Sequence, residues 1–211
     1  MKVCEIFSSI QGESSYAGLP CTFVRLTGCN LRCTYCDTQY AYSEGSELSE
    51  EDIISRVSNA GFNLVEITGG EPLLQKEVYP LIERMIEEGY TVLVETNGSQ
   101  SIRDIDRRAI VILDIKTPGS GMHKEMDLSN LDNIKNKDEV KFVITGSEDY
   151  EWSKDIIHKF RLVNRSGILL SPAYGILAPK DLAKWMLQDR IEARLNLQIH
   201  KYMFDPEKRG V

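Results

Sequence analysis

Residues 27–38 of the chain read TGCNLRCTYCDT, with Cys29, Cys33 and Cys36 separated by three and two intervening residues. This segment follows an apolar run that ends at Leu26 and predicts a strand. Because the segment itself has no regular apolar spacing, we expect the cysteines to lie in a loop. Three thiolates at this spacing suit a four-iron, four-sulfur cluster that leaves one iron without a protein ligand. A structural zinc site is instead closed by four protein ligands. The missing fourth ligand therefore favours an iron–sulfur cluster with an open iron.

A second motif, TGGEP at residues 68–72, lies between an apolar strand and a predicted helix. Glycines at such a point let backbone amides and carbonyls approach a ligand closely, and Glu71 can receive an ammonium group. Taken alone, the motif is typical of a structural turn. Its position downstream of the cysteine triplet favours a functional interpretation.

The three cysteines also admit simpler interpretations. A zinc knuckle could be completed by His123, His158 or His200, or the thiols could be buried and bind nothing. Cys4 and Cys21 lie away from the triplet and are interpreted as small buried hydrophobic residues of the first strands, with no role in the site. Five cysteines in this arrangement do not form a disulfide framework. They indicate a reducing compartment.

Strand and helix patterns alternate along the chain, with no repeat or low-complexity segment between them. The helix expected at residues 49–58 opens with Ser-Glu-Glu-Asp, which is a capping signal. The predicted strands are residues 22–26, 64–68, 91–95, 110–115, 140–145, 168–170 and 195–199. The predicted helices are residues 49–58, 78–88, 150–162 and 179–188, with two shorter ones at 101–108 and 128–136.

This alternation predicts an α/β fold with a mainly parallel sheet, whose ligands collect in the loops after the C-terminal ends of the strands. A complete eight-unit β/α barrel takes roughly 250 residues, whereas the chain has 211. We therefore expect a partial (open) β/α barrel of about six units. Residues 1–211 are expected to form one domain, since a chain of this length can bury one substantial core.

Composition excludes several classes of protein. A net charge of −7 argues against general attraction to nucleic-acid phosphates. No stretch approaches the roughly 20 apolar residues that span a bilayer, and the N-terminus lacks the long apolar run of a secretory signal. We therefore expect a cytoplasmic protein that acts on a small molecule, with neither nucleic acid nor membrane as a partner.

The cysteine triplet, with Tyr35 before its last cysteine, and the TGGEP motif together resemble the radical S-adenosylmethionine (SAM) superfamily. The resemblance implies that the amino and carboxylate groups of SAM chelate the open iron and that the GGEP segment supports the methionine moiety. It also implies that an electron from the reduced cluster cleaves SAM to a 5′-deoxyadenosyl radical.

Three further segments are similar to one family of this superfamily, the 7-carboxy-7-deazaguanine synthases. They are FSSIQGES at residues 7–14, DIKTPG at 114–119, and LQIHK at 197–201 followed by KRGV at 208–211. The resemblance therefore runs from the first strand to the last residue. It implies that the substrate is 6-carboxy-5,6,7,8-tetrahydropterin, which loses ammonia in a ring contraction to 7-carboxy-7-deazaguanine, a precursor of queuosine and related deazapurines.

The same resemblance implies which residues bind the pterin. Arg25 supplies a planar fork suited to the carboxylate of the substrate. The C-terminal tail is expected to close the active site, with the terminal carboxylate at Val211 accepting hydrogen bonds from the guanidine-like edge of the pterin. The pterin-binding residues expected on this basis are Ile10, Gln11, Gly12, Glu13, Arg25, Thr68, His200 and Val211.

Cofactors and partners follow from the same resemblance. Residues 28–40 form the expected cluster loop, with Cys29, Cys33 and Cys36 as iron ligands and the hydroxyl of Thr38 as a ligand of Mg²⁺. A homodimer and an electron donor such as flavodoxin or ferredoxin are also expected. The residues expected to contact SAM are Gly70, Lys116, Thr117, Pro118, Ser171, Pro172, Ala173 and Tyr174.

Two other functions remain as alternatives. The nearest is an activase that makes a glycyl radical on a protein partner, since such enzymes share the cysteine triplet and a glycine-rich motif. The other is a non-catalytic iron–sulfur or zinc module that carries electrons or scaffolds a partner. The N-terminal Gln-Gly-Glu and the C-terminal Lys-Arg-Gly-Val favour the synthase.

Overall fold

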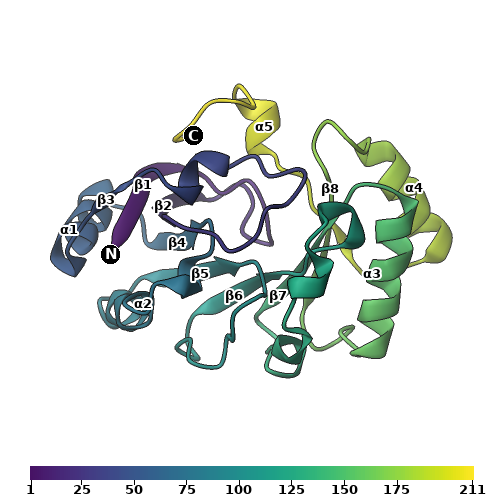
Figure 1. Ribbon diagram of the computed structural model, residues 1–211, viewed down its shortest axis with the longest axis horizontal. Helices are drawn as coiled ribbons and strands as arrows, with labels where there is room; N and C mark the ends of the chain where they lie inside the picture. The colour runs from purple at the N-terminus through teal and green to yellow at the C-terminus, as the bar shows by residue number, and fades with distance from the viewer.

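A curved sheet of nine strands forms the frame of the computed structural model, which describes residues 1–211 (Figure 1). The spatial order is β3-β1-β2-β4-β5-β6-β7-β8-β9. From β2 to β9 every neighbouring pair is parallel, and β1 and β3 are antiparallel at one edge. The strands are β1 (Lys2–Ile10), β2 (Pro20–Leu26), β3 (Ser46–Glu47), β4 (Leu64–Gly69), β5 (Thr91–Thr96), β6 (Ile110–Asp114), β7 (Glu139–Ile144), β8 (Gly167–Pro172) and β9 (Arg194–Leu195). The predicted open, mainly parallel α/β sheet is confirmed.

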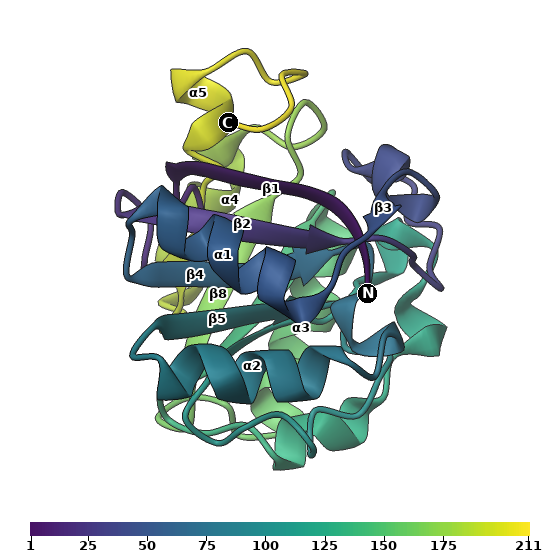
Figure 2. The ribbon, with the colours of Figure 1, turned by 90° about the vertical axis from the view of Figure 1, so that its left-hand side faces the viewer.

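Four helices cover the outside of the curve, and a fifth lies near the C-terminus above β1 (Figures 1 and 2). They are α1 (Glu50–Ala60), α2 (Val78–Glu87), α3 (Ser147–Lys159), α4 (Pro179–Asp189) and α5 (His200–Met203). Short 3-10 turns lie at Gln39–Tyr42, Pro72–Leu74, Pro118–Ser120, His123–Glu125 and Leu128–Asp132. None of the helices combines the length and the apolar character that crossing a membrane would require.

The two faces of the sheet bury different kinds of side chain. Outward-facing residues of the strands, such as Val65 and Phe142, pack against the apolar sides of α1 to α4 in a cluster of 34 buried residues. The inner face has a smaller apolar cluster, which we call the floor. The floor consists of Cys21, Phe23, Leu64, Leu93, Ile110, Ile112 and Leu169. Alternation along each strand places these two sets on opposite faces.

Most predicted elements are present, and the capping signal of α1 is confirmed because the Ser49 hydroxyl accepts from the Asp52 amide at 3.1 Å. The helix expected at 101–108 is wrong. Its residues form turns. The Asp106 carboxylate accepts a hydrogen bond from the Arg108 amide at 2.7 Å, and such a local side-chain bond competes with the hydrogen bonds of a helix. The helix expected at 128–136 is shortened to a 3-10 turn.

The strand expected at 195–199 ends at Leu195, after which the chain leaves the sheet edge toward the loop between β1 and β2. The Ile199 amide donates to the carbonyl of Gly12 at 2.9 Å. His200 therefore begins α5 instead of ending a strand. Of the two isolated cysteines, Cys21 is fully buried as predicted, whereas Cys4 is partly exposed, so its expected burial is wrong.

The floor generates a prediction about stability. Leu93 is completely buried in it, so Leu93→Ala is expected to lower the free energy of unfolding by about 2–5 kcal/mol through lost apolar burial and a residual cavity. Urea unfolding of the cluster-free protein, followed by circular dichroism, measures this. Leu187→Ala is the control because Leu187 is 79% exposed, and it should change stability by less than about 0.5 kcal/mol. Equal effects of the two substitutions would contradict the described floor.

Candidate active site

A cavity of about 820 Å³ opens on the inner face of the sheet, at the C-terminal ends of the strands. Ligands of parallel α/β sheets bind at this edge. All of the site residues predicted from the sequence line the cavity except Thr117 and Pro118. Segments that are far apart in the chain, from the β1–β2 loop to the C-terminal tail, therefore face one space.

The loop after β2 brings the three cysteines to one side of this cavity as free, partly exposed thiols. The sulfur of Cys29 accepts from the Leu31 amide at 3.4 Å and from Asn97 Nδ2 at 3.8 Å. Burial raises the pKa of the Cys29 and Cys33 thiols, so metal binding must displace their protons. Hydrogen bonds to Cys29 stabilise the thiolate that results.

The loop after β4 packs directly on the cysteine loop. The Glu71 amide donates to the carbonyl of Gly28 at 2.7 Å. A side chain at Gly70 would collide with that carbonyl and would place its Cβ 2.7 Å from the Cβ of Cys29. Glycine is required here for the close approach of two backbones, as expected for a ligand-supporting loop.

The expected role of the Glu71 side chain is wrong. Its carboxylate is fully buried and accepts hydrogen bonds from the Leu73 amide, the Asn97 amide and the Thr96 hydroxyl at 2.7–3.0 Å. Burial raises the pKa of Glu71 to about 7, against the opposing effect of the hydrogen bonds from Asn97 and Leu73. Gly69 and Gly70 of this loop line the cavity, whereas Glu71 does not.

The donor set fits an iron–sulfur cluster better than a single metal ion. No three His, Cys, Asp or Glu side chains converge on one ion position, whereas in a four-iron cluster each ligated iron takes its own thiolate. His123, one candidate for a fourth zinc ligand, packs edge-on against Trp152 with ring centroids 6.3 Å apart. His200 lies across the cavity on α5.

The loop after β6 carries the Asp-Ile-Lys-Thr-Pro segment. Lys116 lines the cavity, and its ammonium bonds Asp114 at 2.9 Å. Thr117 is fully buried, because its hydroxyl donates to the Val143 carbonyl at 2.8 Å. Neither Thr117 nor the partly exposed Pro118 lines the cavity. The hydroxyl of Tyr35 is buried nearby without a hydrogen-bond partner.

Arg25 projects from β2 into the cavity. Its Nε donates to Glu5 at 2.8 Å, and its guanidinium lies over the Phe7 ring at 5.7 Å from the centroid. Neither terminal nitrogen has a partner within the protein. The two terminal guanidinium nitrogens, which can bind a carboxylate bidentately, are therefore free, while the bond from Nε to Glu5 fixes the side chain.

The β1–β2 loop is held by its own polar side chains. Gln11 donates to the buried carboxyl of Glu66, and its amide oxygen accepts from the Glu13 amide at 2.9 Å. Burial, together with Glu95 and Glu13, raises the pKa of Glu66 well above its usual range. Gln11 thus fixes the loop while also lining the cavity.

Glu13 faces the cavity from this loop and pairs with Lys141 of β7 at 3.0 Å. Its other oxygen accepts from Gln198 at 2.9 Å. Burial is the largest single effect and would raise the pKa of Glu13, but the Lys141 ammonium and the hydrogen bond from Gln198, acting with His200, outweigh it and lower the pKa. Glu13 is accordingly an ionised acceptor at neutral pH.

His200 reaches the cavity only because residue 12 is glycine. A Cβ on Gly12 would overlap the imidazole of His200 at Nδ1 and lie 2.8 Å from Cγ. Burial lowers the pKa of His200, so its ring is neutral at pH 7. The two residues, almost the whole chain apart, form a single contact in the wall of the cavity.

The C-terminal tail lies above β1 (Figure 2), and its side chains contact the cysteine loop and the turn that follows it. Lys201 forms an ion pair with Asp37, and Arg209 bonds Glu44 at 2.9 Å. The guanidinium of Arg209 also stacks on the Tyr40 ring at 3.8 Å. These contacts hold the last residues of the tail, with Val211, along the rim of the cavity.

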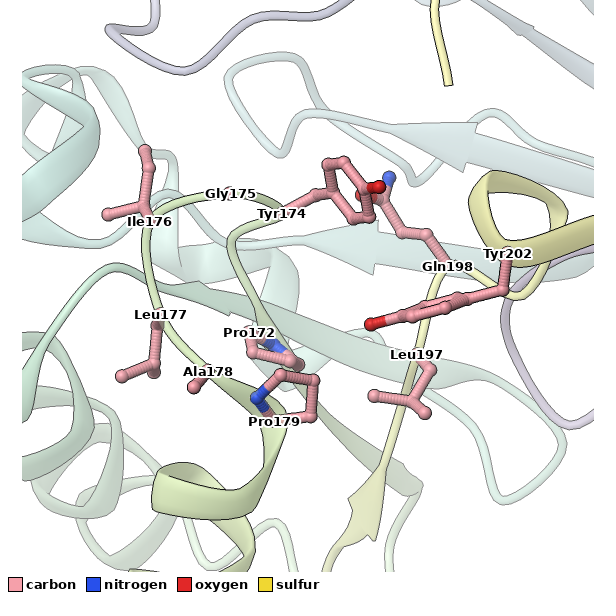
Figure 3. Close-up of a pocket in the computed structure, with 10 residues that line it drawn as sticks. All are labelled: Pro172, Tyr174, Gly175, Ile176, Leu177, Ala178, Pro179, Leu197, Gln198 and Tyr202. Atoms are coloured by element: carbon pink, nitrogen blue, oxygen red, sulfur yellow. The ribbon is translucent and has the colours of Figure 1, made fainter. Parts of the chain in front are cut away.

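A second pocket of about 380 Å³ adjoins the cavity and shares Pro172, Tyr174 and Gln198 with it. Figure 3 shows Pro172, Pro179, Leu197 and Tyr202 arranged around a common space between the β8–α4 loop and the segment before α5. Most of its lining is apolar. Such a pocket suits a flat, weakly polar ring.

Several lining residues were not predicted from the sequence. Glu66, Glu95, Asp114 and Lys141 are charged residues inside otherwise apolar strands, and all four line the cavity. The signal that could have found them is a charge at an interior strand position, which is costly unless it is paired or functional.

Comparison with known proteins finds a matching superfamily model, similar sequences and a similar structure. The family model described as the Radical SAM superfamily matches residues 23–168. A 7-carboxy-7-deazaguanine synthase of Koribacter versatilis is 42% identical over 226 residues, covering 100% of both chains. One from Chlorobaculum tepidum is 41% identical, covering 100% of this chain and 97% of its own. The crystal structure of QueE from Escherichia coli has the same fold, with a TM-score of 0.77 at 22% identity over 93% of this chain and 92% of that one.

The contact between residue 12 and His200 gives a prediction. Gly12→Ala is expected to push the imidazole out of the wall, so that the pKa of His200 rises toward the ordinary value of about 6.5. NMR titration of the cluster-free protein can follow this, because the chain has only three histidines. Gly146→Ala is the control, since no atom lies within 4 Å of a Cβ at Gly146. An unchanged titration of His200 in Gly12→Ala would refute the contact.

Proposed function

The chain belongs to the Radical SAM superfamily and, within it, to the 7-carboxy-7-deazaguanine synthase family, and we propose that it converts 6-carboxy-5,6,7,8-tetrahydropterin to 7-carboxy-7-deazaguanine. It is a radical SAM lyase that uses a four-iron, four-sulfur cluster and SAM, and its product enters deazapurine and queuosine biosynthesis. The observation that carries the assignment is one cavity lined by the cysteine loop, the GGEP loop and a separate polar set that includes Arg25, Glu13 and His200.

Two rival functions fit this cavity less well. A glycyl-radical activase would have to admit a protein segment, and an electron-carrying module would have no use for a polar pocket opposite the cysteines. The similarity to synthases extends over the whole chain, and it favours the enzyme over both rivals.

The cysteine side of the cavity suits the cofactors. When bound, the cluster and SAM supply a 5′-deoxyadenosyl radical that removes the C6 hydrogen of the pterin. Cys29, Cys33 and Cys36 would each hold one iron, and the backbone at Gly70 would support the methionine moiety of SAM. The segment Ser171–Tyr174, with Lys116 opposite, would contact the rest of SAM, and the apolar pocket beside Tyr174 suits its adenine ring.

The opposite side suits the pterin. The free terminal nitrogens of Arg25 would bind the substrate carboxylate, while ionised Glu13 would accept from the guanidine-like edge. Neutral His200 can donate or accept one hydrogen bond. The remaining pterin contacts proposed are Ile10, Gln11, Gly12, Thr68 and Val211.

Further features of the enzyme belong to the same proposal. Thr38 would give Mg²⁺ one oxygen, after its hydroxyl leaves the Asp37 carboxylate to which it now donates at 2.9 Å. Mg²⁺ normally keeps several waters, so it would act at the substrate and not on the fold. The protein would work in the cytoplasm as a homodimer, with flavodoxin or ferredoxin as electron donor.

The direct test of this function is turnover after anaerobic reconstitution with iron and sulfide. Incubation with the tetrahydropterin, SAM, Mg²⁺ and dithionite is expected to give 7-carboxy-7-deazaguanine, detected by mass. Cys29→Ala, Cys33→Ala and Cys36→Ala should each abolish both the visible absorbance of the cluster and turnover, while Cys21→Ala retains both. A reconstituted, SAM-cleaving enzyme that leaves the pterin unchanged would rule out the proposed substrate.

The tail yields a separate prediction. Deleting Gly210 and Val211 removes lining of the cavity without touching the cysteine loop, so the KM for the pterin is expected to rise at least tenfold. Iron content and SAM affinity, measured by equilibrium dialysis, should stay within twofold of the intact enzyme. Met203→Ala is the matched control, because Met203 lies in the same C-terminal segment, is 49% exposed and does not line the cavity. Unchanged kinetics in the deletion variant would show that the tail takes no part in the site.

A further inference from the structure

Four neighbouring parallel strands each place one charged side chain above the apolar floor. They are Glu66 of β4, Glu95 of β5, Asp114 of β6 and Lys141 of β7. Charges inside a sheet are costly unless they are paired. These four residues comprise three carboxyl groups and one ammonium, so Lys141 is the one positively charged residue among them.

The ammonium of Lys141 bonds three carboxylates from three different elements. It lies 3.0 Å from Glu13 of the β1–β2 loop and 3.3 Å from Asp114 of β6, and it donates to Glu95 of β5. Its side chain is 6% exposed. Burial alone would lower the pKa of Lys141, but Glu13, Glu95 and Asp114 outweigh it and raise the pKa.

An ammonium has three N–H donors, and here two of them donate to Glu13 and Glu95, while the Asp114 carboxylate lies at ion-pair distance, 3.3 Å away. The ammonium of Lys141 is therefore engaged by carboxylates of the protein. Glu13 and Glu95 are different, since their side chains are 18% and 25% exposed and both line the cavity. Lys141 thus holds two carboxylates that are more exposed to the cavity than its own side chain.

We propose that Lys141 is a positioning residue for the substrate, which holds Glu13 and Glu95 as a fixed pair of acceptors for the N–H edge of the pterin. This inference rests on the proposed function. A pair of carboxylates at a set spacing selects ligands with matching N–H donors, and an acceptor displaced by a fraction of its bond length loses that selection. The Asp114 carboxylate, 3.3 Å from the ammonium, attracts Lys141 from a third side and restricts its rotation between the two acceptors.

The simpler alternative is that Lys141 only neutralises buried negative charge. The two roles separate in a variant that loses the ammonium and one negative charge together. Lys141→Met combined with Asp114→Asn restores the charge balance and leaves Glu13 and Glu95 in place. A neutralising role predicts normal substrate binding in this double variant, and a positioning role predicts weak binding.

The experiment measures dissociation constants for the tetrahydropterin by anaerobic calorimetry on reconstituted enzyme, without SAM, so that turnover is not required. Wild type, Lys141→Met, Asp114→Asn, the double variant and Lys141→Arg are compared. Lys154→Met is the control, because Lys154 makes ion pairs with Glu151 and Asp189 at the surface. Iron content and melting temperature are recorded for each protein.

We expect Lys141→Met to bind the pterin at least tenfold more weakly than wild type does. The double variant should bind it at least tenfold more weakly than Asp114→Asn does, and Lys141→Arg should recover part of the lost affinity. Lys154→Met should bind as wild type does. Wild-type affinity in the double variant, with cluster and melting temperature intact, overturns the inference and leaves the proposed function standing. A wild-type enzyme that does not bind the pterin overturns both.

Discussion

The buried side chain of Glu71 joins the loops that follow β2, β4 and β5. Its amide donates to Gly28 in the cysteine loop, and its carboxylate accepts from Thr96 and Asn97 after β5. Asn97 in turn donates toward the sulfur of Cys29. Backbone and side-chain hydrogen bonds between strand ends thus hold the cysteine loop in place. A carboxylate that was predicted as a ligand acts as the internal brace of the site.

The interior of the open barrel is divided into an apolar floor and a charged layer above it. The floor packs by the ordinary alternation of strand residues, but the charged layer is stable only because each carboxylate has a partner. Lys141 forms ion pairs with Glu13, Glu95 and Asp114. Gln11 donates a hydrogen bond to the carboxyl of Glu66, whose pKa is raised. The same groups that cost stability inside the sheet give the cavity its polar wall.

The sequence predicted the parts of the site that have local signatures. The cysteine triplet and the TGGEP loop follow strands that are apolar enough to identify, so their convergence at one edge of a parallel sheet was expected. The prediction of a strand at 195–199 was wrong because the Ile199 amide donates a hydrogen bond to the carbonyl of Gly12, which is distant in sequence, and the chain leaves the sheet. Glu95 and Lys141 were missed because a lone charge in an apolar strand carries no local signal of its partner.

The contacts made by the C-terminal tail show why these distant pairings matter. Gly12 admits His200, Asp37 pairs with Lys201, and Tyr40 stacks on Arg209. Each contact joins the last dozen residues to a segment near the N-terminus that already carries the cysteines or the β1–β2 loop. Since β1 is antiparallel at the sheet edge and β9 ends the opposite edge, the tail bridges the open side that a complete barrel would close with further strands. In a barrel too short to close by hydrogen bonding, contacts from the tail join the open edges and bring the β1–β2 loop and the cysteine loop to the same rim.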